Sequence, residues 1–205
     1  AECTGGLETA IHLAAKEILQ KRKEIRLPAV IANYSAGYGR SVQLYGERLV
    51  RFDKAITEKR MDGFVPDLIL EVEDKTLHVE IAVTHFVDEQ KKAKFQQLGK
   101  AAIEVDLSTT DRKMNFSELE SILVDGTDTK RWVFNPKQAA FQKEIFSMGR
   151  ELKILNRRFA SQVDNCPIRM RHWQGKPYAN LVDDCFYCDY FVGYRSNSTN
   201  SHTHI

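Results

Sequence analysis

The residues best suited to chemistry are two acids, Asp67 and Glu80, which flank a short polar segment. Asp67 opens the apolar run 67–72, and Glu80 lies near the middle of the run 77–84. The polar residues 73–76 between the runs predict a β-hairpin. Because paired strands bring residues on one face within about 5–8 Å of each other, both carboxylates could bind one hard cation. Mg²⁺ or Mn²⁺ in such a site can activate water and stabilise charge on a phosphodiester.

Glu80 stands between Val79 and Ile81 in a strand that is otherwise apolar. A carboxylate in that position is costly to bury unless it is paired or bound to a metal ion. Strand alternation equally permits Glu80 to face solvent on a one-sided sheet, so the spacing alone leaves both interpretations open.

A helix is predicted from residue 8 to about residue 23, where apolar residues recur with helical period. Glu8, His12 and Lys16 follow one another at four-residue steps and therefore share one face of this helix. If the helix packs against the hairpin, Glu8 or His12 could complete the shell of the metal ion. The alternative is an exposed face of ion pairs.

Further elements follow along the chain. The sequence predicts a strand over 48–57, a helix over 88–98 that Gly99 ends, a half-buried strand over 101–107, a short helix over 116–123 and a long basic helix over 137–160. This order predicts an α/β fold, in which a small mixed β-sheet has flanking helices.

The segment PDLILEVEDKTLHVEIAVTH, with EKR before it and AAIEVDLS after a helix, resembles the PD-(D/E)XK nuclease superfamily. More narrowly, the chain is similar to the competence protein CoiA-like family, from the Glu8 helix through Ser108 and more loosely to Cys188. The resemblance implies a restriction-endonuclease-like fold and phosphodiester hydrolysis assisted by a divalent ion. It also implies that Asp67 is the aspartate of PD, that Glu80 is the acid of (D/E)XK and that Glu8 is the helical glutamate.

One position departs from this motif, because Ala82 stands where a lysine should follow Glu80 by two residues. A methyl group can neither orient a nucleophilic water nor neutralise an oxyanion. The helix predicted over 88–98 carries Lys91 and Lys94 on the same face as its apolar residues. Migration of the lysine to this helix recurs in the superfamily, so Lys91 or Lys94 is favoured as the catalytic cation over a dead site.

The C-terminal cysteines form a possible zinc site. Cys185 and Cys188 make a C-x-x-C pair, and Cys166 lies upstream at a spacing usual in zinc ribbons. Structural zinc nearly always has four Cys or His ligands, so His172 is the leading fourth ligand, with Cys3, His202 and His204 as alternatives. Reduced cysteines without metal are the other interpretation. A catalytic C-x-x-C is disfavoured, because no βαβ pattern surrounds the pair.

The formal net charge of +2 provides no overall argument for nucleic acid, so such an argument depends on local patches. The C-terminal third contains one, and its residues are predicted to contact DNA: Lys143, Arg150, Arg157, Arg158, Arg169 and Arg171. A solvated basic helix face is the alternative interpretation of the same residues.

Four cysteines in 205 residues are too few for a disulfide scaffold, so we expect a reducing, cytoplasmic location. No apolar run approaches the ~18–20 residues that span a bilayer, so no membrane association is expected. The chain lacks an initiating Met, which leads us to expect an excised piece of a longer protein. Its expected parts are a nuclease core over 1–135, a long basic helix over 136–163, a zinc-binding tail over 164–195 and a disordered end over 196–205.

The sequence therefore predicts a Mg²⁺- or Mn²⁺-dependent DNA nuclease with a structural Zn²⁺ and with a protein partner or a second copy as further contacts. Two alternatives stay open. One is a catalytically inactive nuclease-fold module for DNA binding or assembly. The other is the nuclease subunit of a phage-defence or competence complex.

Overall fold

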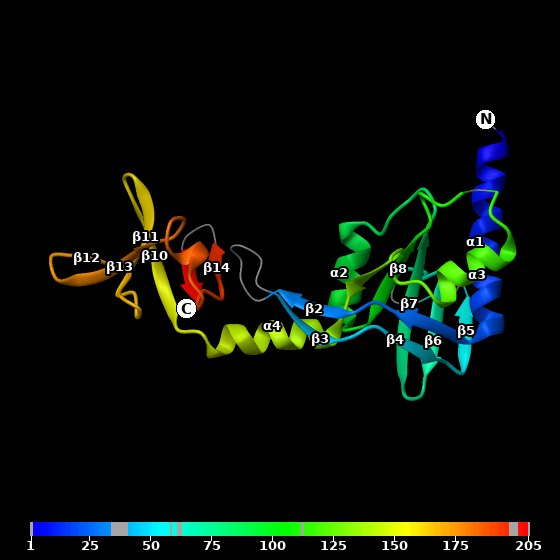
Figure 1. Ribbon diagram of the computed structural model, residues 1–205, viewed down its shortest axis with the longest axis horizontal. Coiled ribbons are helices and arrows are strands. Elements are labelled where there is room, and N and C mark those ends of the chain that lie inside the picture. The colour runs from blue at the N-terminus through cyan, green and yellow to red at the C-terminus, as the bar shows by residue number, and fades with distance from the viewer. Residues whose placement is uncertain are drawn as a thin grey trace. The chain divides into compact units, whose positions relative to one another are not determined.

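The computed structural model describes the backbone of residues 2–33, 41–57, 59–60, 63–111, 113–196 and 201–204, and the side chains of residues 10–194 within those ranges. In these ranges it is a mixed α/β protein with four α-helices and several sheets. None of the helices described is long and apolar enough to cross a membrane. The chain divides into two compact units (Figure 1): an N-terminal unit, Ala1–Val30 with Tyr45–Pro136, and a C-terminal unit, Ile31–Leu44 with Lys137–Ile205.

The N-terminal unit is built on a five-stranded sheet in the order β5-β6-β7-β8-β9. Its strands are β5 (Lys54–Thr57), β6 (Leu68–Val72), β7 (Lys75–Ala82), β8 (Ala102–Asp106) and β9 (Lys130–Phe134). Neighbouring strands are antiparallel except for β7 and β8, which are parallel. The predicted hairpin is confirmed as β6 and β7. The strand predicted over 48–57 is instead two strands, β4 (Arg48–Arg51) and β5, and β4 pairs with β1 (Glu24–Leu27) in a separate ribbon.

Three helices pack on this sheet: α1 (Glu2–Arg22), α2 (Glu89–Leu98) and α3 (Phe116–Val124). In Figure 1, α1 and α3 lie to one side of the strands and α2 lies to the other. The predicted helix over 88–98 is confirmed, including its ends. The Asp88 side chain accepts a hydrogen bond from the Lys91 N–H at 2.7 Å, and Gly99 closes the helix in the left-handed region at φ 61°.

Strand alternation divides the residues of β7 and β8 between the two faces. One set joins α1 and α3 in the main core: Leu77, Val79, Ile81, Ile103 and Val105. The intervening residues His78, Glu80 and Glu104 therefore point to the opposite face. The His78 ring lies there with its centroid 5.5 Å from that of Phe95 in α2.

The strand predicted over 101–107 is confirmed as β8, but it is not half-buried. Glu104, which alternation assigned to the polar face, is fully buried. The reason is that β8 has a strand on each edge, β7 in parallel and β9 antiparallel, and helices cover both faces of the sheet. A single strand's pattern cannot reveal that its second face is covered.

The C-terminal unit contains α4 (Pro136–Met148), a ribbon of β2 (Val30–Asn33) with β3 (Ser41–Tyr45), and a six-stranded sheet. Amide groups of α4 hold β2, because Gln138 Nε2 donates to the Ile31 carbonyl at 2.8 Å and Gln142 Nε2 donates to the Asn33 carbonyl at 3.1 Å. The sheet order is β12-β13-β11-β10-β15-β14, with strands Arg171–Trp173, Lys176–Asn180, Ala160–Asp164, Glu151–Arg157, Ser201–His204 and Gly193–Ser196, respectively.

The prediction of a long basic helix over 137–160, which was expected to make up the part 136–163 of the chain, is wrong. The helix α4 ends at Met148, Gly149 follows, and the chain then forms the hairpin β10–β11. In β10 the buried residues Leu152 and Ile154 alternate with exposed residues. Residues two apart lie on the same face of a strand, so Leu152 and Ile154 can join one core. In a helix the same two residues would lie on different sides.

The prediction of a disordered end over 196–205 is also wrong for the residues that the structure describes there. The strand β15 (Ser201–His204) pairs with β14 on one edge and with β10 on the other. Backbone N–H and C=O groups along β10 need partners, and a polar segment can supply them as well as an apolar one. Polar composition is therefore a weak guide to disorder where a segment can pair with a strand on each side.

A prediction follows from the alternation in β10. Ile154→Ala removes a buried side chain and should lower the free energy of unfolding of the C-terminal unit by about 2–5 kcal/mol. Lys153→Ala, at the exposed neighbouring position, should change it by less than about 0.5 kcal/mol. Chemical denaturation followed by circular dichroism measures both. Equal effects of the two substitutions would contradict the strand.

Candidate active site

A pocket of about 380 Å³ lies in the N-terminal unit where β7 ends and the chain turns toward α2. Seven ionisable residues line it: His12, Asp67, Glu80, His85, Asp88, Lys91 and Glu104. The rest of the wall comes from residues 81–83, 86 and 87. The structure thus brings Asp67, Glu80 and Lys91, three residues singled out in the sequence, to one cavity.

Asp67 immediately precedes β6 and is held from two sides. Its Oδ2 accepts the Ile81 backbone N–H at 2.9 Å and lies 3.0 Å from His12 Nε2, while its Oδ1 lies 3.7 Å from Lys16 Nζ. Burial by itself would raise the pKa of Asp67. The bonds from His12 and Ile81, with the nearby positive charge of Lys16, outweigh it and lower the pKa below its usual value. Asp67 is therefore a fixed, ionised carboxylate.

Glu80 lies in the interior of β7 with its side chain 5% exposed. Its Oε2 accepts a hydrogen bond from Lys91 Nζ at 2.6 Å. Its Oε1 is buried and has no hydrogen-bond partner among the described residues. Burial raises the pKa of Glu80 to about 7 against the lowering effect of Lys91, and the negative charge of Asp67 adds to the rise. Glu80 is thus a buried acid whose charge is only partly compensated.

Glu104 is a residue of this pocket that the sequence did not single out. It is the register partner of Glu80 across the parallel pair β7–β8. Unlike Glu80, both of its oxygens are bonded: Oε1 accepts the Val87 N–H at 2.5 Å and Oε2 accepts Arg131 Nε at 2.6 Å. An acid in an apolar strand could have indicated that Glu104 belongs to a functional site. The alternation of the strand instead predicted that the Glu104 side chain faces solvent.

The two lysines proposed to replace the motif lysine lie in different surroundings. Lys91 reaches Glu80, whereas Lys94 Nζ is 3.4 Å from the Gly63 carbonyl and 5.8 Å from the centre of the Phe64 ring. Ala82, at the position of the motif lysine, is buried and lines the pocket. Lys91 is therefore the lysine that the fold brings to the acidic pair.

Of the two residues of α1 proposed to complete the metal shell, the structure describes one side chain. His12 lies in the pocket and contacts Asp67. The backbone of Glu8 belongs to α1, but its side chain lies outside the described residues.

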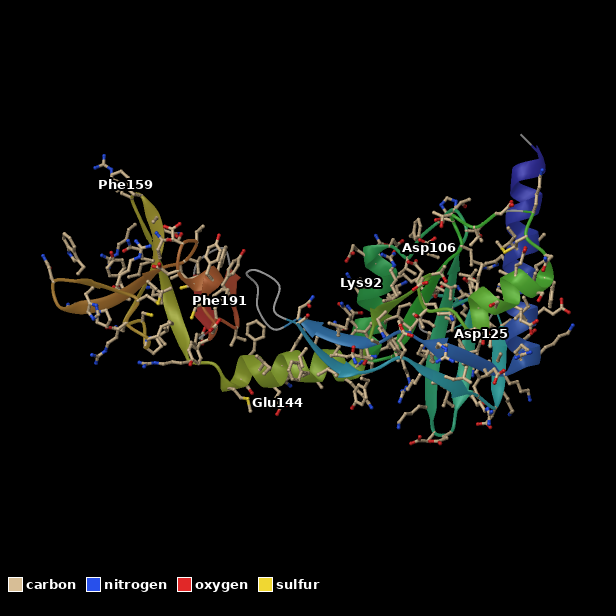
Figure 2. The ribbon with its side chains drawn as sticks, viewed as in Figure 1. Lys92, Asp106, Asp125, Glu144, Phe159 and Phe191 are labelled. Atoms are coloured by element: carbon tan, nitrogen blue, oxygen red, sulfur yellow. The ribbon has the colours of Figure 1, made fainter. Side chains whose placement is uncertain are left out.

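The three C-terminal cysteines are free, buried and part of one cluster in the core of the C-terminal unit. The same cluster contains Phe191, which Figure 2 labels. Burial, and then the proximity of Cys166 and Cys188, raise the pKa of the Cys185 thiol to about 12. His172 is exposed in β12. Among the described side chains, no group of three or more His, Cys, Asp or Glu residues is arranged to hold a metal ion.

The six cations predicted to contact DNA do not share one helix. Lys143 is in α4 and Arg150 follows it; Arg157 and Arg158 are at the end of β10; Arg169 precedes β12 and Arg171 begins it. Two of them are paired with acids: Arg157 Nη2 lies 2.9 Å from Asp164 Oδ2, and Arg171 Nε lies 2.7 Å from Asp184 Oδ2. The single basic face expected from the sequence is therefore dispersed over several elements.

Comparison with known proteins finds no match to this chain among protein-family models, curated proteins or solved structures.

The buried Glu80 predicts a dependence of stability on pH. Because its pKa is about 7 in the folded protein and 4.5 ordinarily, the folded state binds this proton more tightly. Protonation of Glu80 therefore stabilises the folded state. This stabilisation is fully present below pH 4.5 and is lost as the pH rises through 7, which lowers the free energy of unfolding by up to about 3 kcal/mol. Without divalent ions, Glu80→Gln should thus be more stable than the parent at pH 8 and equally stable near pH 4. Urea titrations across this range measure the difference, and a constant difference would contradict the assignment.

Proposed function

We propose that the N-terminal unit is a Mg²⁺- or Mn²⁺-dependent nuclease that hydrolyses phosphodiester bonds of DNA, with Asp67 and Glu80 as metal ligands. The observation that carries the proposal is the buried Oε1 of Glu80, which has no hydrogen-bond partner among the residues that the structure describes and lies in the pocket that Asp67 also lines. A buried anion that is only partly compensated is unfavourable, and a hard divalent cation would complete the compensation.

The donor set fits such an ion. Mg²⁺ and Mn²⁺ prefer oxygen ligands, and Mg²⁺ is commonly bound by one or two carboxylates while waters and phosphate oxygens complete its shell. Asp67 and Glu80 supply two carboxylates, and the pocket has room for the other ligands. When bound, the ion would lower the pKa of a water and stabilise charge on the phosphate.

The protein's own residues have separate tasks in this proposal. The Ile81 N–H and His12 orient Asp67, so that its carboxylate does not have to reorganise when a cation arrives. Lys91 stays beside Glu80 and would donate to a non-bridging phosphate oxygen or to the attacking water. Glu104, with both oxygens bonded, fixes the position of Val87, which is part of the pocket wall.

The arrangement of elements supports a restriction-endonuclease-like fold. A β-hairpin carries both acids, a helix follows the hairpin, and the next strand lies parallel to the second strand of the hairpin. The resemblance of residues 66–85 to the PD-(D/E)XK motif supports the same proposal, and the CoiA-like resemblance makes a competence or phage-defence complex a suitable setting. The free thiols are compatible with the proposed cytoplasmic location.

Digestion assays test the function directly. The parent should cut plasmid or linear DNA when Mn²⁺ or Mg²⁺ is present and should not cut without it. Asp67→Asn and Glu80→Gln each remove a ligand charge, so both should lose activity by at least the ~10²–10³-fold typical of a positioned catalytic group. Circular dichroism controls for folding. A parent that never cuts, or variants that cut like the parent, would overturn the proposal.

Lys91 and Lys94 form a matched pair for the second test, since both are half-buried lysines of α2. Lys91→Ala should lower the cutting rate by ~10²–10³-fold, because it removes the donor beside Glu80. Lys94→Ala should leave the rate nearly unchanged, because its ammonium is directed to Gly63 and Phe64. If both variants retain the parent's rate, Lys91 has no catalytic task.

Ala82 favours a second candidate function, a nuclease-fold module that binds DNA without cutting it. Its methyl group stands in the pocket where the motif has a lysine. DNA binding by a parent that fails to cut with either metal ion would establish this alternative over the first.

We also propose that the C-terminal unit contains one structural Zn²⁺, bound by Cys166, Cys185 and Cys188 with His172 as fourth ligand. Two similar turns support it: the Cys188 N–H donates to the Cys185 carbonyl and the Arg169 N–H to the Cys166 carbonyl, both at 3.0 Å. Each turn begins with a cysteine, as metal knuckles do; the turn that begins at Cys185 ends with Cys188, and the turn that begins at Cys166 ends with Arg169.

Metal analysis tests this site. The purified protein should contain one zinc per chain, and Cys185→Ser should lose it. His172→Ala should lose it as well, while His85→Ala, an exposed histidine of the other unit, should retain it. Because such metal binding is coupled to folding, chelation should unfold the C-terminal unit before the N-terminal unit. A protein without stoichiometric zinc would contradict the site. If His172→Ala retains zinc, His172 is not the fourth ligand, and the three cysteine ligands are unaffected by that result.

A further inference from the structure

A second and larger hollow, of about 920 Å³, lies in the C-terminal unit over one face of its sheet. We call it the sheet groove. Its walls are the end of β10, the strand β11, the turn between β12 and β13, and the start of β13. It contains none of the residues of the pocket described above and none of the cysteines.

Strand alternation separates this groove from the core of the unit. The buried set of the sheet includes Ile154, Val163 and Ala179, and these residues belong to the cluster that contains the three cysteines. Their neighbours in sequence point to the other face, where Asp164 is the register partner of Tyr178. The groove is therefore the solvent face of the sheet, made of side chains that the core does not use.

Aromatic side chains stand exposed along this face. The Phe159 side chain is 93% exposed, and Trp173 is 66% exposed. Figure 2 labels Phe159 at the tip of the β10–β11 hairpin. Tyr178 also lines the groove. Exposed aromatic groups gathered on one concave face are typical of binding surfaces, because they offer flat apolar area with little loss of side-chain entropy.

The charges of the groove suit an anion. Three cations line it (Arg157, Arg158 and Lys176) with one acid, Asp164, so the lining has three positive charges minus one negative, or +2. Lys176 is the register partner of Trp173, and the Arg158 guanidinium lies 5.9 Å from the centre of the Phe159 ring. Each exposed aromatic ring thus has a cation beside it.

We propose that the sheet groove binds single-stranded nucleic acid, with unpaired bases stacked on Trp173 and Phe159 and with phosphates bound by Lys176 and Arg158. Arg157 is already paired with Asp164. Alternating rings and cations match the alternating bases and phosphates of a single strand. A duplex would leave the rings unused, because its bases are stacked on one another along their faces. The role of the groove, which is to hold the substrate, rests on the proposed nuclease function. Binding of nucleic acid to the groove does not itself require cutting.

Intrinsic fluorescence tests the binding. The chain has two tryptophans, and the other one, Trp132, is half-buried with its Nε1 bonded to the Pro28 carbonyl. Titration of the whole protein with dT₁₂ or rU₁₂, with no divalent ion and no chelator, should quench Trp173. The quench should persist in Trp132→Phe and vanish in Trp173→Phe. The two oligonucleotides distinguish DNA from RNA, and a 12-base-pair duplex should bind at least tenfold more weakly.

The affinity is then measured by anisotropy of labelled oligonucleotides, so that the readout does not depend on tryptophan. Trp173→Ala should weaken binding by about tenfold or more, in line with the loss of one stacked base. Tyr190→Ala is its matched control, since Tyr190 is also 66% exposed in the same unit but does not line the groove. Lys176→Ala should weaken binding of all sequences and lower the salt slope by about one.

The outcomes separate this inference from the nuclease proposal. A protein that cuts DNA but shows no quenching, or that loses equal affinity in Trp173→Ala and Tyr190→Ala, overturns the groove alone. A protein that binds through Trp173 but never cuts supports the groove and overturns the nuclease. If Trp173→Ala instead dissociates a dimer seen by sedimentation, with oligonucleotide affinity unchanged, the groove is an interface between copies and the proposal is wrong.

Discussion

The parallel pairing of β7 with β8 is the interaction on which the rest of the N-terminal unit depends. It places Glu80 beside Glu104 in the interior of the sheet, so two carboxylates are buried as neighbours. Two such charges repel each other and have lost most of their hydration, and each therefore needs a cation or a donor. The groups that bond the two carboxylates are the Val87 N–H before α2, Lys91 in α2 and Arg131 in β9. The positions of these elements therefore depend on the acidic pair.

The charges of Glu104 and Glu80 are not compensated equally, and this difference is the main feature of the pocket. Glu104 has a backbone N–H and an arginine, whereas Glu80 has one lysine for one oxygen. Asp67 is bonded from the side of α1 and the end of β7. If stability alone had shaped this region, an apolar residue at position 80 would serve it better, because a buried charge is often no more stabilising than a hydrophobic replacement. An incompletely bonded acid beside an oriented one is the arrangement that the proposed metal site requires.

Local patterns allowed the hairpin, α2 and its Gly99 cap to be predicted, because contiguous residues determine each of them. Asp67, Glu80 and Lys91 could be selected for the same reason: a motif and a helix face supply them. Glu104 and the burial of β8 could not, since they depend on a parallel partner and on helices distant in sequence. The long helix was wrong because residues 151–157 suit a strand once β11 and β15 are available to pair with it. The sheet groove was missed with it, since its residues come together only when that hairpin forms.

The two units have separate cores, and this separation bears on how chemistry and binding can be divided between them. The apolar clusters of the N-terminal unit and the cluster around the cysteines have no residue in common. Changes in the sheet groove therefore need not disturb the carboxylates of the pocket, and a loosened cysteine cluster need not unfold the five-stranded sheet. Sites without shared contacts usually contribute additively to stability. A groove that binds through rings and cations can thus vary in affinity and sequence preference, while the pocket keeps the one arrangement that its buried acids require.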